Sequence, residues 1–257
     1  MTIVGLTIQD GDIIFAGDTR LINPSKIPNE VASRFDFAIK IFKVTDNILI
    51  GIADDYSKKT MELIKKIKKE LNKTDIKGDF YWSYNHNFVA RKISNIVKSS
   101  SVTSQDLLMA IHDMRYNKRY AYKFLQILNH EPHKIEENGF IGLNPEYHDV
   151  IIKNYQKAIE KNNPHNIVDY ANSFLESFKS VRDVTVNSFP ICYVMHDHGI
   201  MTISNGTGFI GENGNVNWVV NTIDENGKWV RKVNNKIIGY IISDVDVINH
   251  SLGTSYK

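Results

Sequence analysis

The chain opens with MTIVGLTIQDGDIIFAGDTR (residues 1–20), and this stretch decides the fold. Residues 2–8 and 13–17 are two alternating apolar runs with the length of short β-strands. The Asp10-Gly11 pair between them is typical of a tight hairpin turn. We therefore expect an antiparallel hairpin at the start of the chain, with the hydroxyl residue Thr2 at the beginning of its first strand.

A second pair of apolar runs follows the first. Residues 37–44 (FAIKIFKV) and 47–53 (NILIGIA) predict two more strands, joined by a turn at Thr45-Asp46. The intervening residues 21–36 have mixed polarity and two prolines, Pro24 and Pro28, which favour a loop. Four strands in the first 53 residues indicate an antiparallel sheet.

Helical spacing of apolar residues begins after Asp55. It predicts a first helix through Leu71, an irregular aromatic-rich stretch over residues 72–87, and a second helix over 88–97. Thr103 or Ser104 caps a third predicted helix, and the apolar face of that helix consists of Leu107, Leu108, Ile111 and Met114.

Strands and helices then alternate in blocks. Strands are expected at residues 120–129 and 133–143, followed by two helices, the second starting at Asn163-Pro164. A strand pair follows at 189–197 and 200–205, and residues 206–257 show further β character. Strands grouped in this way predict an α+β fold of antiparallel sheets with helices outside. With no linker in the sequence, we expect a single domain over residues 1–257.

The composition excludes several classes of function. The 257 residues carry 31 basic and 29 acidic side chains, and this balance gives no global case for nucleic-acid or membrane binding. The basic run at 65–73 is typical of the solvated face of a helix. With Cys192 as the single cysteine, no intrachain disulfide is possible, and we expect a cytoplasmic protein. His196 and His198 lack a third ligand of convincing spacing, so neither a metal nor a cofactor is expected.

The second residue suggests a chemistry. Thr2 directly follows Met1, and removal of that methionine would leave a free N-terminal threonine. Such a residue carries both a hydroxyl nucleophile and an α-amine base, whose ordinary pKa is about 8. A nearby cation favours the deprotonated nucleophile, and a carboxylate is needed to hold that cation.

Residues 2–20, followed by KIFKVTDNILIGIAD at 40–54, resemble the N-terminal half of proteasome β-type subunits and the related bacterial peptidases HslV and Anbu. These are N-terminal nucleophile (Ntn) hydrolases. The resemblance is strong over 2–54, extends in order over 88–205, and is absent from the extension at about 206–257. It implies a four-layer αββα sandwich of two antiparallel sheets flanked by helices.

The resemblance also implies roles for individual residues. Thr2 would be the nucleophile, Lys40 would lower the pKa of that nucleophile, and Asp18 would orient Lys40. Supporting positions would be Arg20 as a partner of this group, Asp183 as a third carboxylate, and the amide of Asp54 as an oxyanion donor. The implied activity is that of a threonine peptidase acting on peptide or amide substrates. The family works as homo-oligomeric rings, and an ATPase partner stays unidentified.

Three departures from the family pattern favour an alternative, a catalytically inactive relative that serves as an assembly or binding module. Alignment on Val4-Gly5 puts Met1 at the nucleophile position, whereas alignment on Asp18 puts Thr2 there. Leu143 stands near the position of an expected serine, and Asp54 replaces a glycine. A third interpretation is a small-molecule amidase.

Overall fold

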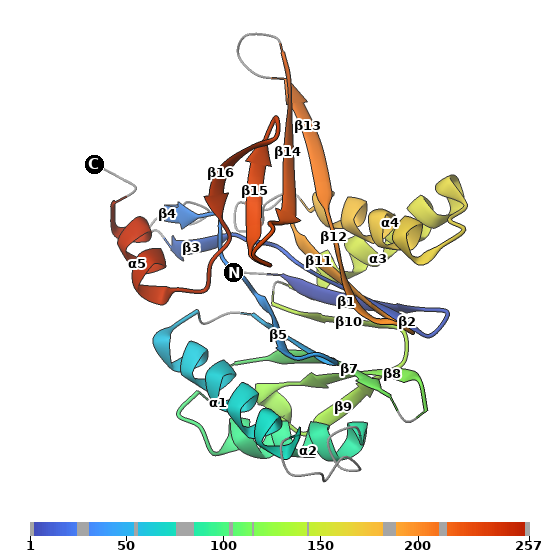
Figure 1. Ribbon diagram of the computed structural model, residues 1–257, viewed down its shortest axis with the longest axis vertical. Helices are drawn as coiled ribbons and strands as arrows, with labels where there is room; N and C mark the ends of the chain where they lie inside the picture. The colour runs from blue at the N-terminus through green and yellow to red at the C-terminus, as the bar shows by residue number, and fades with distance from the viewer. Residues whose placement is uncertain are drawn as a thin grey trace.

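The computed structural model has mixed α+β architecture, with helices and antiparallel sheets (Figure 1). Its description covers residues 3–24, 31–53, 56–75, 85–102, 105–114, 116–142, 144–181, 189–210 and 215–254. In these ranges, no helix combines the length and the apolar character needed to cross a membrane.

The sheet containing the N-terminal hairpin, here the first sheet, has the strand order β10-β1-β2-β11-β12. The predicted hairpin is confirmed: β1 and β2 pair without irregularity from Val4↔Gly17 to Gln9↔Asp12. Asp10 and Gly11 form its turn with φ of 51° and 86°, the conformation that a two-residue hairpin turn requires. The strands are β1 Val4–Gln9, β2 Asp12–Gly17, β10 Asn138–Ile141, β11 Ile191–His196 and β12 Gly199–Ile203.

The second sheet has the order β5-β6-β7-β8-β9 and faces the first across an apolar layer. Val4 and Phe15 from the first sheet and Leu49 and Leu108 from the second belong to this layer. The strands are β5 Ile41–Thr45, β6 Ile48–Ile52, β7 Leu107–Asp113, β8 Lys118–Phe124 and β9 Pro132–Ile135, with a short 3-10 turn, η1, at Gln126–Leu128.

Helices cover the outer face of each sheet. Helices α1 (Lys58–Asp75) and α2 (His86–Lys98) pack on the second sheet, and α3 (Pro145–Asn162) and α4 (Ile167–Lys179) pack on the first. Each sheet is therefore buried on both faces, which explains continuous apolar runs such as that of β2: Phe15 points to the other sheet and Ile14 to the helices.

The helix predicted to begin at Thr103 or Ser104 is wrong, because residues 107–113 form β7. This strand is central in its sheet, between β6 and β8. Leu107 and Met109 face the helices, while Leu108 and Ala110 face the other sheet. A strand that is buried on both faces has no polar side to reveal the two-residue period of a strand. Its apolar run is therefore compatible with a buried strand or with a buried helix. The two candidate caps lie outside the described residues.

Other boundaries also differ from expectation: the helix expected to start at Asn163-Pro164 begins at Ile167, and the strand expected over 120–129 ends at Phe124. The predicted loop at 21–36 contains a two-stranded ribbon, β3 (Leu21–Pro24) and β4 (Val31–Phe35), in which Pro24 is tolerated at a strand end beside a register irregularity. Residues 133–143 form two strands rather than one, β9 and β10, and these belong to different sheets. Helix α1 also extends through residues 72–75 of the stretch expected to be irregular.

The C-terminal extension forms a sheet of its own, with the order β13-β14-β15-β16, followed by helix α5 (Val245–Thr254). The β character of this region is confirmed, whereas α5 was not expected from the sequence. In Figure 1 this sheet, orange to red, rises from the edge of the two stacked sheets. Its strands are β13 Asn205–Ile210, β14 Val216–Ile223, β15 Trp229–Val233 and β16 Lys236–Tyr240.

Candidate functional site

A buried ion pair lies where β2 ends and β5 begins. Lys40 Nζ lies 2.8 Å from Asp18 Oδ1, and the exposed fractions of the two side chains are 1% and 0%. Lys40 also donates a hydrogen bond to the backbone carbonyl of Arg20. Within the described part of the chain, these two contacts occupy two of the three N–H donors of the Lys40 ammonium group.

Asp18 also holds the start of the first strand. Its Oδ1 accepts the backbone N–H of Ile3 at 2.9 Å, and the Asp18 amide donates to the Ile3 carbonyl at 3.1 Å. Its Oδ2 accepts the backbone N–H of Arg20 at 2.9 Å. The β1–β2 register therefore continues to an Ile3–Asp18 pairing, and the hairpin has no bulge to shift it.

Arg20 is held by a second carboxylate that sequence reasoning missed. Its Nε lies 2.5 Å and its Nη2 3.1 Å from the two carboxylate oxygens of Asp36, a bidentate arrangement. Asp36 lies four residues before Lys40 in a stretch that the sequence marked as a loop end. The two segments 18–20 and 36–40 are thus joined at both of their ends.

The electrostatic state of Lys40 depends on its partner. The pKa of Lys40 is lowered, because the buried ammonium loses its hydration. The charge and hydrogen bond of Asp18 offset part of this lowering. The positive charge of Lys40 in this buried position is therefore favoured by its carboxylate partner Asp18.

Of the residues predicted to form the site, the structure brings together Asp18, Lys40 and Arg20. Thr2, Asp54 and Asp183 lie outside the described residues, as does Leu143, so their contacts are not part of this description.

Residues from the C-terminal extension also reach this corner. Arg231 of β15, 4% exposed, donates from Nη2 to Thr19 Oγ1 at 2.8 Å and from Nε to Asn221 Oδ1 at 2.9 Å. Thr19 lies between Asp18 and Arg20 in the chain. Arg231 is separated from Thr19 by 212 positions, and no local pattern in the sequence signals that contact.

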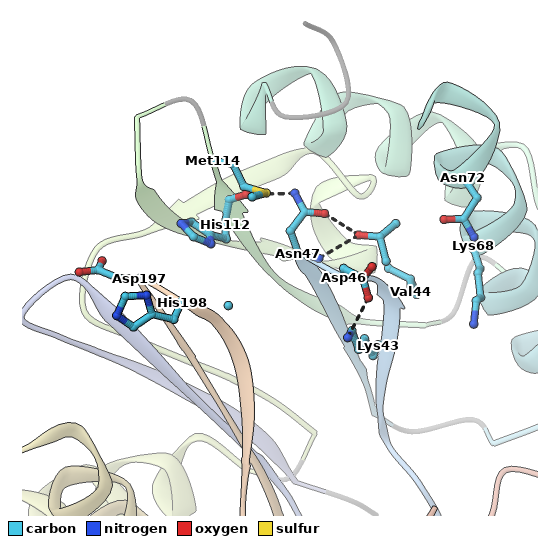
Figure 2. A pocket seen from close by; sticks show the side chains of 12 residues that line it. Lys43, Val44, Asp46, Asn47, Lys68, Asn72, His112, Met114, Asp197 and His198 are labelled. Atoms are coloured by element: carbon cyan, nitrogen blue, oxygen red, sulfur yellow. Dashed lines mark hydrogen bonds and ion pairs between the residues drawn. The ribbon is translucent and has the colours of Figure 1, made fainter. Parts of the chain in front are cut away.

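A pocket of about 640 Å³ lies at the opposite end of β5 from Lys40. Figure 2 shows its lining, with the exposed Lys43–Asp46 ion pair on one side and His112 and His198 on the other. Within the described ranges, no three His, Cys, Asp or Glu side chains gather closely enough to hold a metal ion. Cys192 packs between the first sheet and its helices, and burial raises the pKa of its thiol.

Comparisons with known proteins add no assignment to this geometry. No family model matches the chain, and no curated protein matches it.

Proposed function

We propose that this chain is an amide-bond hydrolase, a threonine peptidase of the proteasome-like class that uses Thr2 as its nucleophile after removal of Met1. We also propose that its fold is the four-layer αββα sandwich of Ntn hydrolases. The order in which the layers pack supports this assignment: helices α1 and α2, the second sheet, the first sheet, and then helices α3 and α4.

The observation that carries the proposal is the buried Lys40–Asp18 pair, in which Asp18 also binds the backbone N–H of Ile3. Thr2 directly precedes Ile3 in the chain, and this is why we propose Thr2 as the hydroxyl that the pair serves. A buried lysine needs a strong reason to be retained, since burying an ion pair costs more in desolvation than a surface pair. Activation of an adjacent hydroxyl is such a reason.

The proposed reaction proceeds through two acyl transfers. The α-amine of Thr2 takes the proton of Oγ, which attacks the substrate carbonyl, and Lys40 stabilises the negative charge at Oγ. Collapse of the tetrahedral intermediate breaks the C–N bond, and the amine product leaves with the proton. Water then hydrolyses the resulting ester, which releases the acid and restores the threonine.

Intact mass spectrometry of the purified protein tests the proposal, with and without an epoxyketone or β-lactone that reacts with N-terminal threonine. We expect loss of one methionine and one adduct per chain, both the adduct and hydrolysis being abolished in Thr2→Ala and strongly reduced in Lys40→Ala. Lys43→Ala is the matched control, because Lys43 lies three residues after Lys40, within β5, and its side chain is 46% exposed. Retention of Met1 without an adduct would refute the hydrolase.

A second candidate function is a non-catalytic assembly or binding module. The feature that favours it is a set of exposed apolar side chains on the C-terminal sheet, from Ile210, Val216, Trp218 and Tyr240. Large exposed apolar patches mark interaction surfaces more often than scattered single residues do. Retained Met1, no adduct and a stable complex in pull-down experiments would favour this function over the hydrolase.

Two details of the proposal follow from the resemblance and are tested separately. The family's rings imply a homo-oligomer, which light scattering during size-exclusion chromatography measures directly. Side-by-side assays of peptide and small acyl-amide substrates separate a peptidase from an amidase.

A further inference from the structure

We propose that Arg231, from the C-terminal extension, is a positioning residue of the candidate active site: it holds the Asp18–Arg20 segment in the geometry that Lys40 needs. This inference rests on the proposed function for its catalytic consequence. Its structural part stands on contacts that can be measured without any activity.

The Arg231 guanidinium is held by two hydrogen bonds and lies against two aromatic rings. Its two hydrogen bonds go to Thr19 and Asn221, and its central carbon lies 4.6 Å from the ring centre of Phe37 and 4.8 Å from that of Phe189. Cations stacked on aromatic faces within about 6 Å are attracted to them. Two hydrogen bonds and two rings together fix the orientation of the Arg231 guanidinium. Its hydrogen bond to Thr19 Oγ1 therefore restrains the position of the Thr19 side chain.

Thr19 passes the restraint on to both catalytic segments. Its hydroxyl donates to the Phe189 carbonyl at 3.2 Å, and its backbone carbonyl accepts the amide of Ala38 at 2.9 Å. Its two chain neighbours are Asp18, which pairs with Lys40, and Arg20, whose carbonyl accepts from Lys40. A shift of Thr19 therefore moves both acceptors of the lysine.

The extension also holds the other segment through its backbone. The Ile242 amide donates to the Phe37 carbonyl at 2.7 Å, and the Ile242 carbonyl accepts the Ile39 amide at 2.9 Å. A Cβ at Gly239 would lie 2.7 Å from the Phe37 ring, so this ring packs directly on the β16 backbone. Residues 37–39, immediately before Lys40, are thus bound to the extension by a single parallel β-bridge between Ala38 and Ile242.

The charges at this corner are linked as well. Burial lowers the pKa of Arg231 to about 10, so the group stays cationic at neutral pH. Asp36 favours its charge and Arg20 opposes it. Arg231 therefore adds a third cation beside Arg20 and Lys40, against the two carboxylates Asp18 and Asp36. An additional positive charge lowers the pKa of a neighbouring α-amine or hydroxyl.

The test compares Arg231→Met, Arg231→Lys and Thr19→Val with Arg119→Met as the matched control. The Arg119 side chain is 8% exposed and bonds the Gly11 carbonyl at 2.8 Å and Asp12 at 2.9 Å, at the far end of the same hairpin. Two quantities are measured for each variant: amide hydrogen exchange across the hairpin, and the rate of β-lactone acylation as a function of pH.

We expect Arg231→Met and Thr19→Val to accelerate exchange at Arg20 and Ala38, and Arg119→Met to accelerate it only around the Asp10-Gly11 turn. Acylation should fall roughly 10- to 100-fold in Arg231→Met, the scale expected of a misplaced reacting group. Its pH midpoint should also shift upward. Arg231→Lys should restore the midpoint but not the rate, because one ammonium cannot reproduce the planar fork.

Combining Arg231→Met with Thr19→Val should change exchange by less than the sum of the two single effects, since both remove the Arg231–Thr19 hydrogen bond. Unchanged exchange at Arg20 and Ala38 in both single variants would overturn the inference. If Arg231→Met does not fold, Thr19→Val decides it by the same exchange criterion. If amide exchange changes in the variants but the wild-type protein forms no β-lactone adduct, the structural role of Arg231 stands. That result would refute only the proposed function.

Discussion

Replacing Lys40 by methionine tests the central ion pair through stability rather than activity. Methionine keeps the length and apolar stem of the side chain but leaves Asp18 buried without its cation, with the amides of Ile3 and Arg20 as its remaining described donors. Removing one partner of a buried ion pair costs about 3–5 kcal/mol in the free energy of unfolding. For a chain of this size, that loss lowers the melting temperature by about 6–20 °C.

The pH dependence of this loss gives the sharper readout. Burial raises the pKa of Asp18, and Lys40 opposes that rise, so removing Lys40 raises the pKa in the native state further above its unfolded value. A carboxyl with a raised native pKa favours folding below its unfolded pKa and loses that contribution as pH rises through the native pKa. The destabilisation in Lys40→Met should therefore be smallest in acid and grow toward neutral pH.

Urea unfolding followed by circular dichroism between pH 4 and 8 measures both effects, with Lys43→Met as control. Lys43 pairs with the fully exposed Asp46, and a surface pair contributes only about 0.2–1 kcal/mol. A loss below about 1 kcal/mol in Lys40→Met, or one that does not vary with pH, would refute the reading of Asp18 and Lys40 as a mutually dependent buried pair.

Three further predictions concern buried contacts in the two stacked sheets and the titration of His148 in α3. Gly51→Val should lower the free energy of unfolding by about 1–3 kcal/mol through overpacking, because a Cβ at this position would lie 2.8 Å from Phe15 of the opposite sheet. Chemical denaturation measures this loss, and a neutral effect would contradict the close contact between the sheets. Tyr193→Phe should cost about 1–3 kcal/mol in the same assay by leaving the buried Trp229 indole N–H without its acceptor at 2.7 Å. Burial lowers the pKa of His148, so its contribution to stability should be present above pH 6.5 and decline as pH falls below that value. Melting temperatures of His148→Gln measured between pH 5 and 8 should lack this decline, and an unchanged decline would contradict the role of His148.

The sequence predicted the N-terminal hairpin well because its signals are local. Residues 4–17 combine two apolar runs with an Asp-Gly turn, and the structure pairs them as expected. Asp18 and Lys40 were found through the family pattern, and the fold brings them within hydrogen-bond distance. By contrast, the seven buried residues of β7 carry no periodic signal, and only the neighbouring strands make them a strand.

The residues that the sequence did not reveal depend on long-range contacts. Asp36 ended a stretch without apolar periodicity, yet it binds Arg20 in a bidentate ion pair. Arg231 belongs to an inner strand of the extension, a region that the sequence predicted only as further β structure. Its partner Thr19 lies between the charged residues Asp18 and Arg20, 212 positions away. Such contacts are set by how sheets pack on one another, which composition and spacing do not encode.

The interleaving of strands has a consequence for how the protein is made. Strand β1 pairs with β10, β2 pairs with β11, and Thr19 meets Arg231 212 positions later. A chain emerges from the ribosome at about 5–20 residues per second. Arg231, which hydrogen-bonds Thr19 at the end of the first hairpin, is therefore made about 10–40 s after Thr19. Until residues 138–141 have been made both edges of the hairpin lack their partner strands, and the β2 edge lacks its partner until residues 191–196 follow. This makes the hairpin a candidate client for chaperones that shield unpaired strands. The corner around Asp18 and Lys40 is consequently among the last parts of the molecule to assemble, and truncated translation products would lack it.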